Sequence, residues 1–304
     1  MSTAHTPAEL VLGTAQLCDP QSSSDSRDES NRVILAALNA GVKWIETSPT
    51  YGHAETHVGQ ALRTTKRAHV ITKLGPIQTQ DGTRSIRELV TEKVSQTCSR
   101  LNVDRLEVLT LSSVTEIKAN GGVLWRTLKE LRNEGVIYDL GVAVASPDEA
   151  MIAIAEPAIT YMQLQFNVLD RRWQEAGVIE ALGHRPDILV HAHSALLYGM
   201  LAGTPGKKWP AIAAVDPEAL RLTLWTMAKT MGRDCPADLC INYVRAQPWI
   251  HGVIAGAKST SQLALNIARF KRPALTSDEI AQVNAVMPSA SSAALSHASQ
   301  TRAA

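Results

Sequence analysis

The chain has 304 residues and a formal net charge of +1, with 45% hydrophobic and 19% charged residues. This composition excludes long disorder, collagen-like repeats and disulfide-stapled miniproteins. The near-neutral charge argues against a protein whose main task is to bind nucleic acid, because that task needs a basic face.

The cellular setting is predicted from the cysteines and the apolar runs. The four cysteines have no metal-type CxxC spacing, which indicates reduced thiols. Residues 1–9 lack the apolar core of a secretion signal, and no apolar run reaches the ~18 residues of a membrane span. We therefore expect a cytoplasmic protein that works away from membranes. The sequence gives no signal of its oligomeric state.

Apolar runs alternate with amphipathic segments along the chain. The runs rich in Val, Ile and Leu predict eight strands, at Leu10–Leu17, Val42–Ser48, His69–Leu74, Leu106–Leu111, Ile137–Val144, Tyr161–Phe166, Ile188–His193 and Gly252–Ala255. Apolar spacing of three and four residues predicts helices at Glu29–Asn39, Glu55–Thr64, Ile86–Leu101, Leu124–Asn133, Pro147–Ala155, Trp173–Leu182, Pro217–Met231 and Ser259–Phe270, with an extra helix at Cys235–Arg245.

Eight β-α repeats of ~30 residues favour a single α/β domain, a (β/α)8 TIM barrel, over an open doubly wound sheet. No GxGxxG follows the first strand, which weakens the open alternative. We expect the barrel to span residues 1–287, including a C-terminal helix, and residues 288–304 to form a loose Ser/Ala-rich tail. Chemistry in such a barrel belongs at the carboxyl ends of the strands.

Five segments at or near these strand ends resemble, in order and spacing, the aldo-keto reductases, especially the small bacterial type. They are Leu12–Gln16, Gly41–Glu55, Val70–Lys73, Gln163–Arg172 and Gly256–Asn266. The resemblance covers roughly residues 10 to 285. It implies a (β/α)8 barrel that uses NADP(H) to reduce a small-molecule carbonyl compound.

The resemblance carries the family's four catalytic positions onto this chain. Tyr51 matches the general acid that protonates the carbonyl oxygen, and Lys73 matches the cation that lowers the tyrosine pKa toward the working pH. The family's Asp falls on Glu46, whose carboxylate can still pair with Lys73. The family's His falls on Ser112, a short hydroxyl that acts on a carbonyl only through a water. The catalytic tetrad has therefore departed from the pattern at two positions.

The implied cofactor site is also altered. The Ser-Asn pair that binds the nicotinamide amide has become Ala143 and Val144, and the aromatic that stacks on the nicotinamide has become His193. Lys258 matches a partner of the adenosine 2′-phosphate. The remaining cofactor-binding positions that match the family are Gln163, Ser194, Gly256, Ser259, Gln262 and Asn266.

Several residues have competing interpretations. His193 is a candidate replacement acid or base, because a histidine with a pKa near neutrality suits that role; the alternative is a hydrogen-bonded pair with His191, two residues earlier on the same strand face. A metal site is not expected, because these two histidines have no evident third ligand. His53 and Trp173 are candidate substrate contacts, with a surface loop and core packing as alternatives.

Two functions stay open at this stage. The first is an NADP(H)-dependent oxidoreductase that reduces an aldehyde, ketone or sugar-type carbonyl, with Tyr51 as general acid. The second keeps the barrel without hydride transfer, as a lyase, isomerase or dehydratase or as a non-catalytic relative, because the tetrad His and the Ser-Asn pair are both lost. Fold analogy alone does not choose between them.

Overall fold

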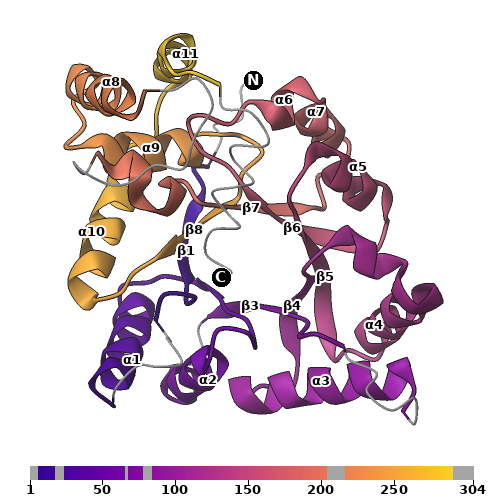
Figure 1. Cartoon of the computed structure of the whole chain (residues 1–304). Coiled ribbons are helices and arrows are strands. Elements are labelled where there is room, and N and C mark those ends of the chain that lie inside the picture. Colours follow the sequence, from indigo (N-terminus) through magenta and orange to yellow (C-terminus); the bar gives the residue numbers. More distant parts are fainter. Residues whose placement is uncertain (1–5, 18–23, 66–67, 78–83, 204–215, 290–304) are drawn as a thin grey trace.

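The computed structural model of the chain describes residues 6–17, 24–65, 68–77, 84–203 and 216–289. Eight parallel strands close into a barrel, each strand pairing with the next and β8 pairing with β1 (Figure 1). The strands are β1 (Glu9–Gly13), β2 (Trp44–Glu46), β3 (His69–Lys73), β4 (Leu106–Leu111), β5 (Ile137–Val144), β6 (Ile159–Gln165), β7 (Leu189–His193) and β8 (Gly252–Gly256). All eight predicted strands are present, and the predicted TIM barrel is confirmed.

Helices surround the barrel between successive strands (Figure 1). The α-helices are α1 (Ser24–Asn39), α2 (Ala54–Thr64), α3 (Ile86–Leu101), α4 (Val123–Asn133), α5 (Pro147–Ala155), α6 (Arg172–Glu175), α7 (Val178–Gly183), α8 (Pro217–Thr230), α9 (Pro236–Arg245), α10 (Thr260–Lys271) and α11 (Ser277–Val286). Short 3-10 helices lie at η1 (Val114–Ile117), η2 (Ala119–Gly122) and η3 (Leu197–Ala202). The extra helix predicted before the last strand is α9.

Several predicted bounds differ from the structure, such as the strand predicted at Val42–Ser48, which is only Trp44–Glu46, and two of the differences have clear local reasons. The first strand stops at Gly13 because the chain turns there, with the Leu17 amide donating to the Thr14 carbonyl at 3.0 Å. The helix predicted over Trp173–Leu182 is instead the pair α6 and α7. Gly177 separates them with a φ of +74°, a left-handed conformation that interrupts an α-helix and that glycine adopts without strain.

Two apolar layers hold the barrel together. The outer layer lies between strands and helices and contains most of the buried apolar residues. The inner layer fills the barrel itself, with Val11, Ile71, Val108 and Tyr161 completely buried in it. Alternation along each strand sends neighbouring residues to different layers. Inward-facing polar side chains toward the carboxyl ends of the strands therefore sit on a rigid apolar floor.

None of the helices in these described ranges combines the length and the apolar character that crossing a membrane demands. The tail predicted for residues 288–304 falls, from residue 290 onward, outside the described residues.

Candidate active site

Three side chains meet at the carboxyl ends of β2 and β3. Lys73 Nζ donates to Glu46 Oε1 at 2.8 Å and to the Tyr51 hydroxyl at 2.5 Å. The Tyr51 hydroxyl in turn donates to Glu46 Oε1 at 3.1 Å. One carboxylate oxygen thus accepts hydrogen bonds from both the ammonium and the phenol. The structure brings together three of the four positions that the sequence assigned to the tetrad.

The local backbone explains this meeting. Glu46 is the last residue of β2 and Lys73 the last of β3, and the two strands pair in parallel. Tyr51 lies in the turn before α2, where its amide donates to the Ser48 carbonyl at 3.0 Å and its carbonyl accepts from Ala54 at 3.1 Å. Glu46 is 3% exposed, so its charge would be costly without the paired Lys73.

The charges in this cluster set the protonation of Tyr51. Burial raises the pKa of Tyr51, the Glu46 carboxylate raises it further, and Lys73 opposes both. Burial disfavours the Lys73 ammonium, but Glu46 and Tyr51 outweigh that effect and raise the pKa of Lys73 above its usual value. Lys73 thus lowers the pKa of Tyr51, as predicted, but burial and then the Glu46 carboxylate outweigh it, so the net shift in the chain without ligand is upward.

Ser112 stands apart from this cluster. Its side chain is exposed, and its backbone amide donates to Glu116 Oε1 at 2.9 Å. The adjacent Ser113 amide donates to the same oxygen at 3.0 Å, so Glu116 caps the short helix η1. Ser112 makes no hydrogen bond to Glu46, Tyr51 or Lys73 in the described structure, and its backbone amide stabilises the start of η1.

His193 ends β7 and faces the positive charges of the site. Its Nδ1 lies 2.9 Å from the Ser194 hydroxyl, and Ser194 has a left-handed φ of +60°. Burial, Lys73 and Arg172 lower the pKa of His193 to about 3. The shift is away from the expected pKa near neutrality, first because burial disfavours the charged imidazole and then because Lys73 and Arg172 are nearby cations. This direction favours the neutral imidazole.

His191, two residues earlier, packs inside the barrel. Its ring makes edge contacts with Trp44 and Tyr161, and burial followed by His251 lowers its pKa to about 3. Within the described residues, no group of three or more His, Cys, Asp and Glu is placed to hold a metal ion.

An ion pair after β6 braces the same end of the barrel. Arg172 Nε contacts both carboxylate oxygens of Asp170 at 3.0 Å, and Arg172 Nη1 donates to the Ala145 carbonyl at 2.9 Å. This pair fixes the loop after β6 against the end of β5. It also places the guanidinium where it acts on His193.

The two predicted substrate contacts have different outcomes. Trp173 is 0% exposed, and its Nε1 donates to the Gln165 carbonyl at 3.0 Å and to Asp170 at 3.2 Å. It is a core residue that positions the loop, so the prediction that it touches substrate is wrong. His53 is exposed at the N-terminus of α2, two residues after Tyr51, and its contact with substrate stays a prediction.

The inner wall has polar groups that fit a nicotinamide cofactor. Gln163 Oε1 and Gln165 Nε2 are buried without a hydrogen-bond partner. Two glycines, Gly13 and Gly256, pair across β1 and β8, and a Cβ at Gly13 would come within 2.9 Å of the Ile254 side chain. Unmet amide groups on β6 and positions without side chains on β1 and β8 leave polar contacts and room for a flat, amide-bearing ring.

The loop after β8 is held by its own side chains. The Lys258 amide donates to Gln262 Oε1 at 2.9 Å, Ser259 caps α10, and Asn266 Nδ2 donates to the Gly256 carbonyl at 3.1 Å. The Lys258 side chain is exposed. The residues predicted to bind the adenosine phosphate therefore lie together around one loop. The side chains of Ser259, Gln262 and Asn266 hold its backbone, and Lys258 is its exposed cation.

An unexpected carboxylate occupies the start of α10. Glu29, from α1, accepts a hydrogen bond from the Thr260 amide at 3.0 Å, and Arg32 pairs with its other oxygen at 2.9 Å. The hydrogen bond from Thr260, followed by Arg32, lowers the pKa of Glu29. A helix N-terminus attracts anions, and at the start of α10 Glu29 supplies that anion from within the chain.

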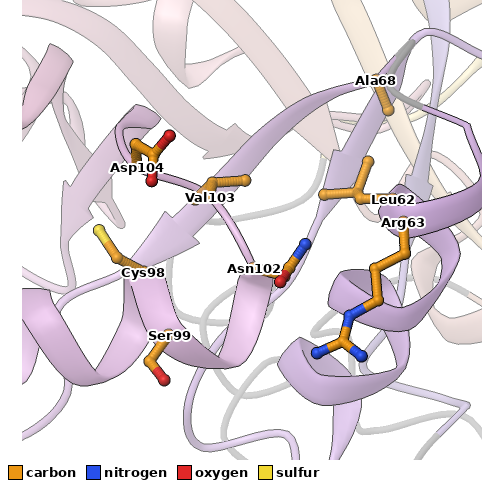
Figure 2. Close-up of a pocket in the computed structure, with 8 residues that line it drawn as sticks. All are labelled: Leu62, Arg63, Ala68, Cys98, Ser99, Asn102, Val103 and Asp104. Carbon is orange, nitrogen blue, oxygen red and sulfur yellow. The ribbon is translucent and has the colours of Figure 1, made fainter.

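A separate groove of about 690 Å³ lies at the opposite end of the barrel (Figure 2). It is lined from the ends of α2 and α3 and from the segments entering β3 and β4, by Leu62, Arg63, Ala68, Cys98, Ser99, Asn102, Val103 and Asp104. These segments precede their strands, so the groove is remote from the Glu46, Tyr51 and Lys73 cluster.

A closed (β/α)8 barrel with a tyrosine, a lysine and a carboxylate at its carboxyl end defines a class of barrel oxidoreductases. The Aldo/keto reductase family profile matches residues 9–288. The chain therefore belongs to the aldo/keto reductase family, whose members use nicotinamide cofactors.

Relatives and solved structures agree with this family. The chain is 23% identical over 286 residues to the uncharacterized oxidoreductase YqkF of Bacillus subtilis, covering 90% of each chain. It is 31% identical over 143 residues to D-arabinose 1-dehydrogenase of Saccharomyces cerevisiae, covering 44% of this chain and 42% of that one. The holo form of aldo-keto reductase AKR11C1 from Bacillus halodurans superposes with a TM-score of 0.76 at 21% identity, covering 92% of both chains. The glycerol dehydrogenase AKR11B4 from Gluconobacter oxydans has a TM-score of 0.74 at 23% identity, covering 92% of this chain and 91% of that one.

Sequence reasoning missed Gln165 and Glu29. Gln165 lies two residues after Gln163 on the same strand. The two-residue period of a strand was therefore a signal that both side chains share the inner face. Glu29 had no such signal, because it lies 231 residues from Thr260 and only the closed barrel brings α1 to α10.

Proposed function

We propose that this chain is an NADP(H)-dependent oxidoreductase that reduces the carbonyl group of a small molecule, an aldehyde, a ketone or a sugar-type compound. The observation that carries the proposal is the hydrogen-bonded cluster of Glu46, Tyr51 and Lys73 at the carboxyl end of the barrel. Membership of the aldo/keto reductase family supports an oxidoreductase and lends no support to the non-redox alternative.

In the proposed reaction, bound NADPH supplies the hydride to the carbonyl carbon. Tyr51 is the group that gives its hydroxyl proton to the carbonyl oxygen. Lys73, 2.5 Å from the phenol oxygen, stabilises the phenolate left behind. Glu46 keeps Lys73 charged and, through its own contact with the phenol, holds Tyr51 protonated before the reaction.

The proposed role of His193 changes with its lowered pKa. A neutral imidazole cannot deliver a proton as imidazolium at pH 7, but it remains a hydrogen-bond donor. When Ser194 donates to Nδ1, the proton sits on Nε2, which is then free to polarise a substrate carbonyl. His193 would thus take part of the role vacated at Ser112, which we retain only as a water-binding position.

The remaining cofactor contacts are proposed from their placement. Gln163 and Ser194 would bind the nicotinamide end, while Gly256, Lys258, Ser259, Gln262 and Asn266 would hold the adenosine phosphate. His53 would line the substrate entrance. We further propose that one domain, residues 1–287, does this work in the cytoplasm, where the reduced cysteines fit, without nucleic acid or membrane partners.

Cofactor binding is the first test. Purified protein is titrated with NADPH and with NADH while tryptophan fluorescence is followed, and NADPH oxidation is then measured with a panel of aldehydes, ketones and sugars. Saturable binding followed by carbonyl-dependent oxidation is the expected result. Absence of binding of either cofactor at millimolar concentration would rule out the proposal.

A further inference from the structure

Three buried polar atoms on β6 and β7 face the interior of the barrel without a partner. They are the Tyr161 hydroxyl, Gln163 Oε1 and His191 Nδ1, and none makes a hydrogen bond to any residue that the structure describes. Their residues are 0%, 5% and 2% exposed, respectively. Native proteins keep few unpaired buried polar atoms, and most of those that seem unpaired bind an ordered water.

The strand register places the three residues side by side. Gln163 of β6 pairs in register with His191 of β7, and Tyr161 lies two residues before Gln163. Tyr161 and Gln163 share the inner face of β6, because Met162 and Leu164 belong to the layer between strands and helices. The ring centres of Tyr161 and His191 are 5.0 Å apart.

The unpaired nitrogen of His191 is on the β6 side of its ring. A Cβ built on Gly252 of β8 would lie 2.8 Å from both Cδ2 and Nε2 of His191, so this edge of the imidazole faces β8. Nδ1 is on the opposite edge. Because β7 lies between β6 and β8, Nδ1 faces the side on which Tyr161 and Gln163 lie.

The phenol of Tyr161 extends from the wall into the barrel. A Cβ built on Gly141 of β5 would lie 2.7 Å from Tyr161 Cδ1, so the base of the ring rests against β5. The ring packs in one apolar cluster with Val11, Ile71 and Val108, which come from three other strands. These apolar side chains offer the Tyr161 hydroxyl no hydrogen bond.

The protonation of the three groups is complementary to one water molecule. Burial and then the Glu46 carboxylate raise the pKa of Tyr161, so its hydroxyl keeps its proton and can donate. Burial and then His251 lower the pKa of His191 to about 3, so the imidazole is neutral, and its Nδ1 accepts when Nε2 carries the proton. Gln163 Oε1 is a carbonyl acceptor. A water molecule accepts from one donor and gives its two protons to two acceptors.

We propose that Tyr161, His191 and Gln163 hold one ordered water molecule inside the barrel. The Tyr161 hydroxyl donates to this water, and the water donates to His191 Nδ1 and to Gln163 Oε1. A carbonyl oxygen has two lone pairs, so Gln163 Oε1 keeps a second site for the proposed cofactor. This inference goes beyond the proposed function, because the water belongs to the free protein and does not depend on carbonyl reduction.

A crystal structure of the free protein at high resolution tests the site directly. We expect one water within about 3.2 Å of all three atoms. H191N keeps an acceptor close to the place of Nδ1 and should retain the water, whereas H191L removes the acceptor and should lose it. A wild-type structure with no water there, or with a direct hydrogen bond from Tyr161 to His191, would overturn the proposal.

Stability separates a bound water from an unpaired hydroxyl, because the two predict opposite signs. If Tyr161 donates to a buried water, Y161F removes a hydrogen bond and should raise the equilibrium constant of unfolding, measured in urea, about 2- to 10-fold. If the hydroxyl has no partner, its removal should lower that constant. The control is Y138F, which alters a tyrosine that is 55% exposed on β5. An unchanged or lower constant for Y161F would contradict the water site.

Nuclear magnetic resonance of nitrogen-15-labelled histidine checks the direction of the hydrogen bond. The signals of His191 are identified by their loss in H191N. At pH 7 we expect the proton on Nε2, and we expect Y161F to change the chemical shift of the unprotonated Nδ1. A proton on Nδ1 would mean that this nitrogen donates, which is the reverse of the proposed arrangement.

Discussion

The hydroxyl of Tyr51 donates to Glu46 Oε1 at 3.1 Å, the same oxygen that accepts from Lys73 at 2.8 Å. Glu46 therefore acts on the phenol directly as well as through the lysine. Burial raises the pKa of Tyr51, the negative charge of Glu46 raises it further, and Lys73 lowers it. The balance of these three effects decides how firmly Tyr51 keeps the proton that the proposed carbonyl reduction would consume.

Replacing Glu46 should move the pH dependence of reduction. Reduction requires protonated Tyr51, so the rate falls as pH rises through the tyrosine pKa. E46Q removes the charge that raises this pKa, so the loss of rate should begin at lower pH than in wild type. E46D keeps the charge but shortens the reach to the phenol, so an intermediate shift is expected. Ultraviolet titration of the tyrosinate signal provides an independent measurement; profiles that coincide for all three proteins would contradict the role assigned to Glu46.

Removing the Tyr51 hydroxyl should abolish most of the activity. General acid catalysis contributes about 10²–10⁴-fold, so we expect Y51F to lower kcat by at least about 100-fold. NADPH affinity should change little, because the hydroxyl serves the substrate. The matched control is Y138F, which alters a tyrosine that is 55% exposed on β5. Full activity in Y51F would remove the basis of the proposed mechanism.

Glu29 should oppose binding of a cofactor that carries a 2′-phosphate. Its carboxylate accepts from the Thr260 amide at the start of α10, next to Lys258, and like charges in one site repel. E29Q should therefore tighten NADPH binding several-fold and leave NADH unchanged. The comparison is made by fluorescence titration at low ionic strength, with E218Q on α8 as the control. If E29Q tightened the binding of NADPH and NADH equally, or of neither, Glu29 would not act on the 2′-phosphate.

The two barrel histidines should make the stability of the fold sensitive to acid. They should not make the reaction rate sensitive to pH near neutrality. The pKa of His191 and of His193 is about 3 in the fold and about 6.5 in an unfolded chain. Between these values the unfolded state binds more protons, so stability is complete above about pH 6.5 and declines as pH falls toward 3.

H191Q should reduce this acid sensitivity by up to about 1.4 kcal/mol per pH unit, measured by urea unfolding at pH 4 to 7. The rate of reduction by the wild type should show no inflection that is due to His193 between pH 6 and 7. The pH profiles of the wild type and H193N should therefore have the same shape in this range. Such an inflection would mean that His193 titrates as an ordinary histidine.

Gly252 should tolerate no side chain. A Cβ there would lie 2.8 Å from the His191 ring and 2.9 Å from a Val11 methyl, inside a closed barrel that cannot expand. We expect G252A to lower the free energy of unfolding by about 1–3 kcal/mol. The control is G183A at the end of α7, where a Cβ would have nothing within 4 Å. Equal stability of the two variants in urea would contradict the packing described for His191.

The alternation of strands and helices was predictable because it depends on local periodicity. The strand at Ile137–Val144 and the helix at Ile86–Leu101 have the predicted bounds, since each has a continuous apolar pattern. The break at Gly177 was not predicted, because a single glycine within an amphipathic segment is compatible with a continuous helix.

The sequence by itself determined the barrel, the family and the residues at the strand ends, because these follow from residue types and their order. It could place Glu46, Tyr51 and Lys73 near one another but not say that one carboxylate oxygen would serve both partners. Only the tertiary structure decided that burial lowers the pKa of His193, that Trp173 is buried, and that Glu29 reaches α10. Protonation, burial and contacts across hundreds of residues depend on distances between side chains, and those distances are set when the barrel closes.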